Sequence, residues 1–399
     1  MKRYKLLNNV LGWVVFVIAA VTYILTLEST ASFWDCGEFI ASGYKLEVGH
    51  PPGNPIFMLT ARFFANFASS PSEVAYMVNL MSGLLSAATI LLLFWTITRL
   101  AQKIVLRDGE TEETMSLGQM IAILGCGLVG ALAYAWSDTF WFSAVEGEVY
   151  AYSSFCTALV FWLILKWESV ADLPHANRYI ILIAYIIGVS IAVHLLNLLC
   201  IPAIVLVYYY RKYKNTDLKG SLIALLVSFV LIVLLLYGLV PGFVEVASWV
   251  ELLFVNVFHL PFNSGVVFYF FLIVGVIAWA IYETYAQRSD KLIKISFLIS
   301  IVLVGIPFIG DGYIIGIVLT AALAYYLFTR KKLAVVAMNT ILLSLFVIFI
   351  GYSSYALIVI RSTANTPMDQ NSPEDIFSLG GYLNREQYGD RPLFYGQTF

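Results

Sequence analysis

The chain has 399 residues, of which 60% are hydrophobic and only 12% are charged, and its formal net charge at pH 7 is −2. Soluble globular proteins carry about 25% charged residues, whereas this sequence repeats solid apolar runs of roughly 17–25 residues, the length that crosses a bilayer. These features exclude a soluble enzyme, a disordered chain and a β-barrel with short alternating strands. They predict an all-α integral membrane protein.

The apolar runs predict a bundle of about 11 transmembrane helices. The first run follows Lys2, Arg3 and Lys5 and is not followed by a small-residue cleavage site, so it is expected to remain as a helix with a cytoplasmic N-terminus. The predicted spans are Val10–Leu27, Val74–Leu100, Gly118–Trp136, Val149–Trp167, Tyr179–Val193, Leu195–Tyr210, Ser221–Leu239, Val266–Tyr285, Ile295–Ile309, Tyr313–Thr329 and Leu333–Ile360.

The apolar block between Arg178 and Arg211 fits either one long helix or a hairpin. Basic residues lie at both of its ends, and the positive-inside rule places both ends in the cytoplasm. A hairpin that turns near His194 and Asn197 is therefore expected. Its short arms and polar tip suggest a cavity below the outer surface, where irregular backbone is tolerated.

The charged residues divide between the two predicted sides of the membrane. The arrangement places 18 of the 23 lysines and arginines in cytoplasmic segments, as expected for a correct orientation. The outward basic residues are Lys45, Arg62, Arg361, Arg385 and Arg391. Acidic residues show the reverse distribution, with 16 of 25 in outward segments. Because acidic residues contribute little to orientation, their outward concentration points to a function.

The first outward loop, residues 28–73, is the longest connection between predicted spans. Asp35 and Glu38 are three residues apart, which places both carboxylates on one face of a helical turn. The aromatic residues around them, Phe33, Trp34 and Phe39, would exclude water and raise the proton affinity of a general base. The alternative is a structural one, in which Asp35 caps a short interfacial helix and Glu38 lies in its first turn.

The same loop contains a second motif and a second short helix. His50 precedes Pro51-Pro52-Gly53, a stiff turn that would either present His50 at the membrane surface or simply lead into a helix. The apolar run Phe57–Phe67 is too short to cross a bilayer and contains Arg62, so it is expected to lie in the interface.

Further candidates lie in the second outward loop and at the hairpin tip. Glu146 and Glu148 adjoin an apolar span and would line the cavity of Asp35, or else remain solvated in an aromatic belt. His194 and Asn197 are intramembrane polar groups, which are functional candidates by default. A histidine bonded to a helix end is the competing interpretation.

Several common motifs are absent from the sequence. It contains no P-loop, HExxH, GxSxG or CxxC pattern and no basic tract for nucleic acid. It also lacks a matched pair of helices broken by glycine or proline, the usual mark of an inverted-repeat transporter.

The first outward loop resembles a family of multi-pass membrane proteins that was long known only as a domain of unknown function. This family is common in bacteria, and its animal member is a protein O-mannosyltransferase of the endoplasmic reticulum. The resemblance rests on WDCGEF at residues 34–39, HPPGNP at 50–55, VHLLNLL at 193–199, and the segments 367–375 and 382–392. Together these matches extend over almost the whole chain.

The resemblance implies a GT-C type glycosyltransferase that transfers a sugar, mannose or a similar hexose, with inversion. The donor would be a polyprenyl-phosphate sugar, and the acceptor a Ser or Thr hydroxyl of an exported protein. Asp35 maps onto the acidic residue that acts as general base, with Glu38 and His50 orienting the acceptor or tuning Asp35. Lys45, Arg62 and Arg361, assisted by His194, are the candidates for stabilising the leaving phosphate. The resemblance implies no certain cofactor, and a divalent metal has no support in the sequence.

The predicted spans and the resemblance together give the domain boundaries. Residues 1–360 are expected to form the transmembrane domain, with the extracytoplasmic loop at 28–73. Residues 361–399 are expected to begin a longer extracytoplasmic region, because bacterial relatives continue further. In a bacterium the protein would lie in the inner membrane with its active face and C-terminus outside. Two rival functions stay open: a transporter or flippase for a lipid-linked substrate, and an assembly subunit.

Overall fold

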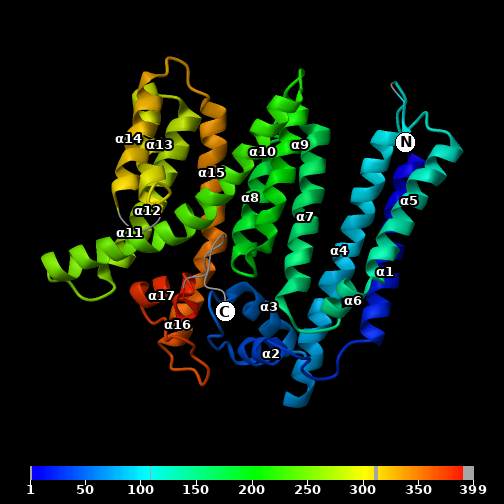
Figure 1. The fold of residues 1–399 in the computed structure, drawn as a ribbon, viewed down its shortest axis with the longest axis horizontal. Helices are drawn as coiled ribbons and strands as arrows, with labels where there is room; N and C mark the ends of the chain where they lie inside the picture. The colour runs from blue at the N-terminus through cyan, green and yellow to red at the C-terminus, as the bar shows by residue number, and fades with distance from the viewer. Residues whose placement is uncertain (1, 108, 310–312, 390–399) are drawn as a thin grey trace, which may run out of the picture. The chain divides into compact units, whose positions relative to one another are not determined.

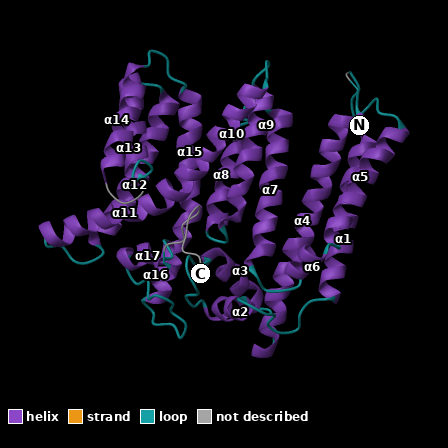
Figure 2. Cartoon of the chain, in the orientation of Figure 1, coloured by secondary structure: helices purple, strands orange, loops and turns teal. Residues whose placement is uncertain are grey.

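The computed structural model describes residues 2–107, 109–309 and 313–389. Regular structure in these residues is helical, apart from an isolated bridge between Val48 and Asp369 (Figures 1 and 2). The chain divides into two compact units. The first contains Met1–Glu47 and Asn54–Ala224, and the second contains Val48–Gly53 and Leu225–Phe399. The end of the 382–392 motif, with Arg391, lies outside the described residues.

The predicted multi-pass helical bundle is confirmed. Within the described ranges, eight helices are long and apolar enough to cross a membrane. They are Arg3–Leu25, Pro71–Val105, Leu117–Ala135, Val149–Val170, Leu195–Lys212, Leu218–Val257, Ser264–Ala286 and Val335–Ser362. The other three predicted spans also coincide with helices, but these are shorter. They are α8 (Arg178–Ile191), α13 (Asp290–Leu303) and α14 (Tyr313–Thr329).

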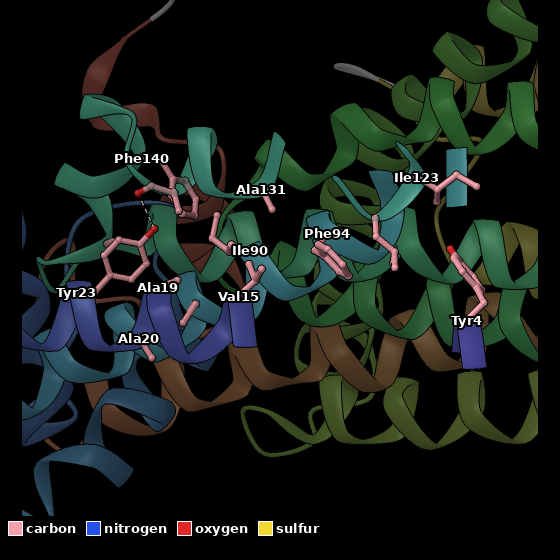
Figure 3. Packing of buried hydrophobic residues seen from close by; sticks show 14 of the residues in the cluster. Tyr4, Val15, Ala19, Ala20, Tyr23, Ile90, Phe94, Ile123, Ala131 and Phe140 are labelled. Carbon is pink, nitrogen blue, oxygen red and sulfur yellow. Dashed lines mark hydrogen bonds between the residues drawn. The ribbon is translucent and has the colours of Figure 1, made fainter. Parts of the chain in front are cut away.

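One core of the first unit is built by α1 (Lys2–Leu25), α4 (Val74–Val105), α5 (Leu117–Ala135) and α6 (Asp138–Ala144). Figure 3 shows its buried side chains, which run from Tyr4 at one end to Tyr23 and Phe140 at the other. The hydroxyl of Tyr23 donates a 2.9 Å hydrogen bond to the carbonyl of Ala135. This buried hydroxyl is therefore satisfied by the backbone of a neighbouring helix.

A second core of this unit carries the first predicted outward loop. The loop contains two short helices, α2 (Cys36–Lys45) and α3 (Pro55–Ala65), which pack on the beginning of α4. Phe39 and Phe57 lie in its buried centre, with ring centroids 5.4 Å apart. The sequence-based expectation of short helices in this loop is confirmed, and their apolar faces are buried against protein.

The block from Arg178 to Arg211 is a hairpin, as predicted. Helix α8 ends at Ile191, a 3₁₀ segment follows at Leu195–Cys200, and α9 extends over Ile201–Lys212. Both helices pack on α7 (Val149–Val170). The end of α9 returns to the start of α8, because Arg211 pairs with Asp172 in the connection between α7 and α8.

The predicted inner and outer segments of the first unit lie at opposite ends of its helices. At one end Lys5 lies 3.7 Å from Glu112, and Lys103 pairs with Glu168. At the other end the Glu28 N–H donates to the carbonyl of Val145 at 3.2 Å, which joins the two predicted outward loops. Segments far apart in sequence thus share an end as the charge pattern indicated.

The second unit continues from α10 (Leu218–Val233), which crosses the boundary between the units. A π-helical stretch at Leu234–Leu239 leads directly into α11 (Val240–Leu252), so the helix does not end at Leu239 as predicted. Proline at the second position of α11 removes one backbone donor, and the wider π-turn just before it accommodates that loss. Helices α12 (Ser264–Ala286), α15 (Val335–Tyr352), α16 (Ala356–Ser362) and α17 (Ile376–Leu383) complete the unit together with α13 and α14.

Buried polar groups organise this second unit. Glu251 of α11 is 1% exposed and accepts hydrogen bonds from the N–H groups of Asn263 at 2.5 Å and Val266 at 3.0 Å. This carboxylate therefore caps the beginning of α12 from a neighbouring helix, where the helix dipole also favours a negative charge.

Candidate active site

Four carboxylates of the first unit gather where its two predicted outward loops meet, and we call them the acidic cluster. They are Glu28, Asp35, Glu146 and Glu148. The thiol of Cys36, at the beginning of α2, interacts electrostatically with Asp35, Glu146 and Glu148. The carboxylate of Glu146 interacts in the same way with that of Glu28. The predicted cavity partners Asp35, Glu146 and Glu148 are thus brought together.

The cluster is held in place by α4. Asn79 is fully buried, and its side-chain amide donates to the carbonyls of Glu28 at 2.7 Å and Thr30 at 3.1 Å. Gly147, between the two clustered glutamates, lies so close to α4 and α2 that a Cβ there would come 3.0 Å from Asn79 Oδ1 and 3.1 Å from Ile40. Both loops are therefore fixed to the same turn of α4.

Asp35 and Glu38 were predicted as a pair of carboxylates in the first loop, and Asp35 is the one exposed to solvent. It occupies the N-cap position of α2, but its side chain makes no capping hydrogen bond, and Glu38 lies half-buried in the first turn. The predicted aromatic shelter is wrong for two of its three members. Phe33 and Trp34 are 79% and 91% exposed, while Phe39 turns into the core. Asp35 is therefore exposed to solvent.

Glu146 and Glu148 are the buried members of the cluster, at 6% and 7% exposure. Burial raises the pKa of Glu146, and the charge of Glu28 raises it further, although hydrogen bonds with Ser32 and Cys36 oppose the shift. Burial and the neighbouring carboxylates raise the pKa of the Cys36 thiol to about 12. The site thus combines an exposed carboxylate with a buried one that holds its proton more tightly than usual.

The hairpin tip contributes an imidazole to the same end of the unit. His194 Nδ1 accepts a 3.1 Å hydrogen bond from the N–H of Leu196, and its ring lies against Tyr150 with 5.4 Å between centroids. The Tyr150 hydroxyl in turn interacts electrostatically with the carboxylates of Asp35 and Glu148. Asn197 is buried and donates to Ser190 Oγ at 2.9 Å, which closes the hairpin from within. His194 therefore adjoins the cluster, while Asn197 joins the two arms.

The predicted phosphate-binding cations lie elsewhere in this unit. Arg62 of α3 donates to the carbonyl of Tyr44, and its guanidinium lies 5.3 Å from the Tyr44 ring centroid, so it joins α3 to α2. Lys45 is exposed, with its ammonium 4.0 Å from Glu47. Across the described residues, no group of three or more His, Cys, Asp or Glu side chains is arranged to hold a metal ion.

His50 and Arg361 belong to the second unit. The carbonyl of His50 accepts from the N–H of Gly53 at 3.0 Å, which closes the predicted turn. The hydroxyl of Tyr382 donates to the carbonyls of Gly49 at 2.6 Å and His50 at 3.3 Å. Gly53 has a φ of +77°, a conformation that glycine adopts without strain. Arg361 lies in the last turn of α16.

Comparison with known proteins gives one consistent result. Residues 35–217 match the N-terminal domain of the protein O-mannosyl-transferase TMEM260. This part of the chain is related to that family. The mouse protein O-mannosyl-transferase TMEM260 is 27% identical over 209 residues, which cover 52% of this chain and 27% of the mouse protein. The Dictyostelium discoideum protein is 23% identical over 189 residues, or 46% of this chain and 20% of that protein.

The relation to TMEM260 therefore covers about half of this chain and about a quarter of the mouse protein's length. No solved structure matches the chain. The matched range begins at Asp35 and contains every candidate site residue named above except Glu28 and Arg361. It also contains most of the first unit, including the helices that hold the acidic cluster.

The sequence analysis did not identify three residues that build this site. Asn79 is an amide inside an otherwise apolar predicted span, a signal that would have singled it out. Gly147 separates two acidic residues, which suggests a close backbone approach. Cys36 was visible in the motif, but its burial among carboxylates depends on the packing of α2.

Proposed function

We propose that this protein is a glycosyltransferase that moves a mannosyl or similar hexosyl group from a polyprenyl-phosphate donor to Ser or Thr hydroxyls of exported proteins. The observation that carries the proposal is the match of residues 35–217 to the TMEM260 N-terminal domain, a range that includes Asp35, Glu146 and Glu148 of the acidic cluster. The names of the matching mouse and Dictyostelium proteins supply the reaction class.

Asp35 is the general base in this proposal. A base must reach the hydroxyl proton that it removes, and Asp35 is exposed while Glu146 and Glu148 are buried. Trp34, directly before Asp35, has a φ of 60°, a conformation that is costly for a tryptophan and that tends to persist at functional sites. The exposed rings of Phe33 and Trp34 offer flat apolar surfaces beside the carboxylate for a sugar or acceptor peptide.

The proposed reaction is one displacement at the anomeric carbon. Asp35 accepts the proton of the acceptor hydroxyl as its oxygen bonds to that carbon. The bond from the anomeric carbon to the phosphate oxygen breaks on the opposite face, so the configuration inverts and polyprenyl phosphate leaves. Glu38 orients the acceptor, and Glu148 adds negative charge near Asp35. His194 adjoins the cluster, and because its Nδ1 accepts from the N–H of Leu196, we assign its Nε2–H as a hydrogen-bond donor to the leaving phosphate.

We place the acidic cluster and residues 361–399 on the extracytoplasmic side and the N-terminus in the cytoplasm. The supporting observation is that the basic segments of the first unit lie at the end of its helices opposite the cluster. Cytoplasmic segments of membrane proteins carry an excess of lysine and arginine. Four further residues remain predicted to bind substrate: Lys45, Arg62, His50 and Arg361.

The test uses purified protein in lipid with polyprenyl-phosphate [14C]mannose and a Ser/Thr-rich acceptor peptide. Asp35→Asn should lower transfer by about 100-fold or more, since general acid–base catalysis contributes typically 10²–10⁴-fold. Asp138→Asn is the matched control, because Asp138 is also exposed and lies in the second outward loop. It should retain wild-type transfer.

Three results would count against the proposal. Full transfer by folded Asp35→Asn would remove Asp35 from the role of base. An equal loss in Asp138→Asn would show a general effect of outward charge. No transfer by wild-type protein, combined with movement of the labelled lipid between leaflets, would favour the flippase instead.

A further inference from the structure

A polar cavity of about 470 Å³ lies at the other end of the first unit. It opens between the beginning of α1, the last third of α4 and the end of α7. Its lining includes Lys5, Asn8, Trp95, Arg99, Trp162 and Lys166. We call it the basic cavity. Along α7 its lining residue Lys166 is 18 residues from Glu148, about 27 Å at 1.5 Å per residue, so it is separate from the acidic cluster.

The basic cavity has a surplus of positive charge. Three cations line it, Lys5, Arg99 and Lys166, against one carboxylate, that of Glu112. Glu112 lies 3.7 Å from the Lys5 ammonium and also accepts from Gln102 at 3.4 Å. The negative charge of Glu112 is therefore already engaged by Lys5 and Gln102 of the lining.

Arg99 and Lys166 have no carboxylate within ion-pairing distance in the described part of the chain. The Arg99 guanidinium makes one long hydrogen bond, 3.4 Å to Gln102 Oε1. The Lys166 ammonium lies 4.8 Å from the centroid of the Trp162 ring. The single carboxylate of the lining does not balance three cations, which repel one another, and a bound anion would lower that cost.

Neutral groups of the lining complete the environment for such an anion. Trp95 and Trp162 lie 5.8 Å apart and form one apolar wall. The side chains of Asn8 and Asn9 also line the cavity. The cavity thus offers cations, neutral polar side chains and aromatic faces together.

We propose that the basic cavity binds a phosphate group, carried either by the headgroup of an anionic phospholipid or by a small soluble phosphate ester. Arginine and lysine side chains form charge-assisted hydrogen bonds to phosphate oxygens, and the planar guanidinium does so through two donors at once. Basic cavities between membrane helices on the cytoplasmic side commonly hold phospholipid headgroups. Occupancy would hold the ends of α1, α4 and α7 together. The proposal does not depend on transferase activity.

The test compares phosphate probes with full-length protein that has been delipidated in a neutral detergent. Native mass spectrometry measures retention of phosphatidylglycerol against phosphatidylcholine, and calorimetric titration measures binding of glycerol 1-phosphate and inorganic phosphate. The test variant is Arg99→Gln with Lys166→Gln. The control is Arg107→Gln with Lys214→Gln, which removes the same charge from exposed positions outside the cavity lining.

Binding by wild type and control that weakens at least tenfold in the test variant supports the proposal. Phosphatidylglycerol as the responding probe identifies a lipid source, and glycerol 1-phosphate or inorganic phosphate identifies a soluble source. Equal binding by all three proteins, or binding of no probe by wild type, overturns it. If the double variant unfolds, Lys166→Gln alone serves, since that side chain is exposed, and Arg99→Lys should retain binding.

Discussion

A Cβ placed on Gly147 would lie 3.0 Å from the side-chain oxygen of Asn79, a separation tighter than an ordinary van der Waals contact. Gly147 joins the two buried glutamates of the acidic cluster, and Asn79 binds the loop that leads to Asp35. One close approach to α4 therefore sets the distance between the two outward loops.

Gly147→Ala should disturb this approach. The added methyl group meets Asn79, Ile40 and Val78 at 3.0–3.1 Å, and overpacking of this kind costs about 1–3 kcal/mol. We expect a lower thermal midpoint in detergent and weaker sugar transfer, because the glutamates must move. Gly125→Ala is the control: nothing lies within 4 Å of a Cβ there, and alanine in a helix interior should stabilise slightly. Equal midpoints for the two variants would contradict the packing argument.

Asn79→Ala should release residues 28–30 from α4. It removes two hydrogen bonds, to the carbonyls of Glu28 and Thr30, and an ordinary intramolecular hydrogen bond contributes about 0.5–1.5 kcal/mol. Limited proteolysis should therefore cut the first outward loop faster than in wild type. Asn339→Ala removes a comparable amide bond, 2.9 Å to Thr284 Oγ1, in the second unit, and should leave that cleavage rate unchanged. An unaltered rate in Asn79→Ala would show that α4 does not anchor the loop.

Glu146 should make stability depend on pH. Its pKa is raised by folding, so the folded state binds the proton more tightly, and this stabilisation is complete below the ordinary pKa of 4.5. It is lost as the pH rises through the folded value. Thermal midpoints between pH 4 and 8 should therefore fall in wild type relative to Glu146→Gln, which does not titrate. A difference that stays constant, or that grows in favour of wild type with pH, would contradict the assignment.

Glu251→Ala should destabilise the second unit by about 1–3 kcal/mol, because two N–H groups at the beginning of α12 lose their acceptor. Glu251→Gln keeps one side-chain oxygen and should lie between alanine and wild type. The measurement is the unfolding midpoint in detergent, and an alanine variant as stable as the glutamine variant would argue against capping.

Much of the fold was predictable because hydropathy and charge are local properties of the chain. Apolar runs predicted helices at each of the eleven spans, and the arginines at 178 and 211 predicted the hairpin. Helix ends were less accurate. The span expected to end at Leu239 continues to Val257, because a π-helical stretch allows the helix to pass Pro241.

The candidate site was predictable as a set of residues and less so as an arrangement. The outward acidic residues singled out Asp35, Glu146 and Glu148 correctly as neighbours. The bond from Arg62 to the carbonyl of Tyr44 was not predictable, and two of the rings expected to cover Asp35 are exposed. Side-chain partners depend on helix packing, which no local pattern encodes.

The sequence by itself determined which segments are apolar helices and which loops share an end of the first unit. A bilayer selects runs of sufficient length, and the basic residues separate from the acidic ones along the chain. Only the tertiary structure decided that Asp35 is open while Glu146 is buried, and that Arg99 and Lys166 face one cavity. Exposure and unpaired charge arise where helices distant in sequence pack together, because burial and Coulomb energy depend on distances in space.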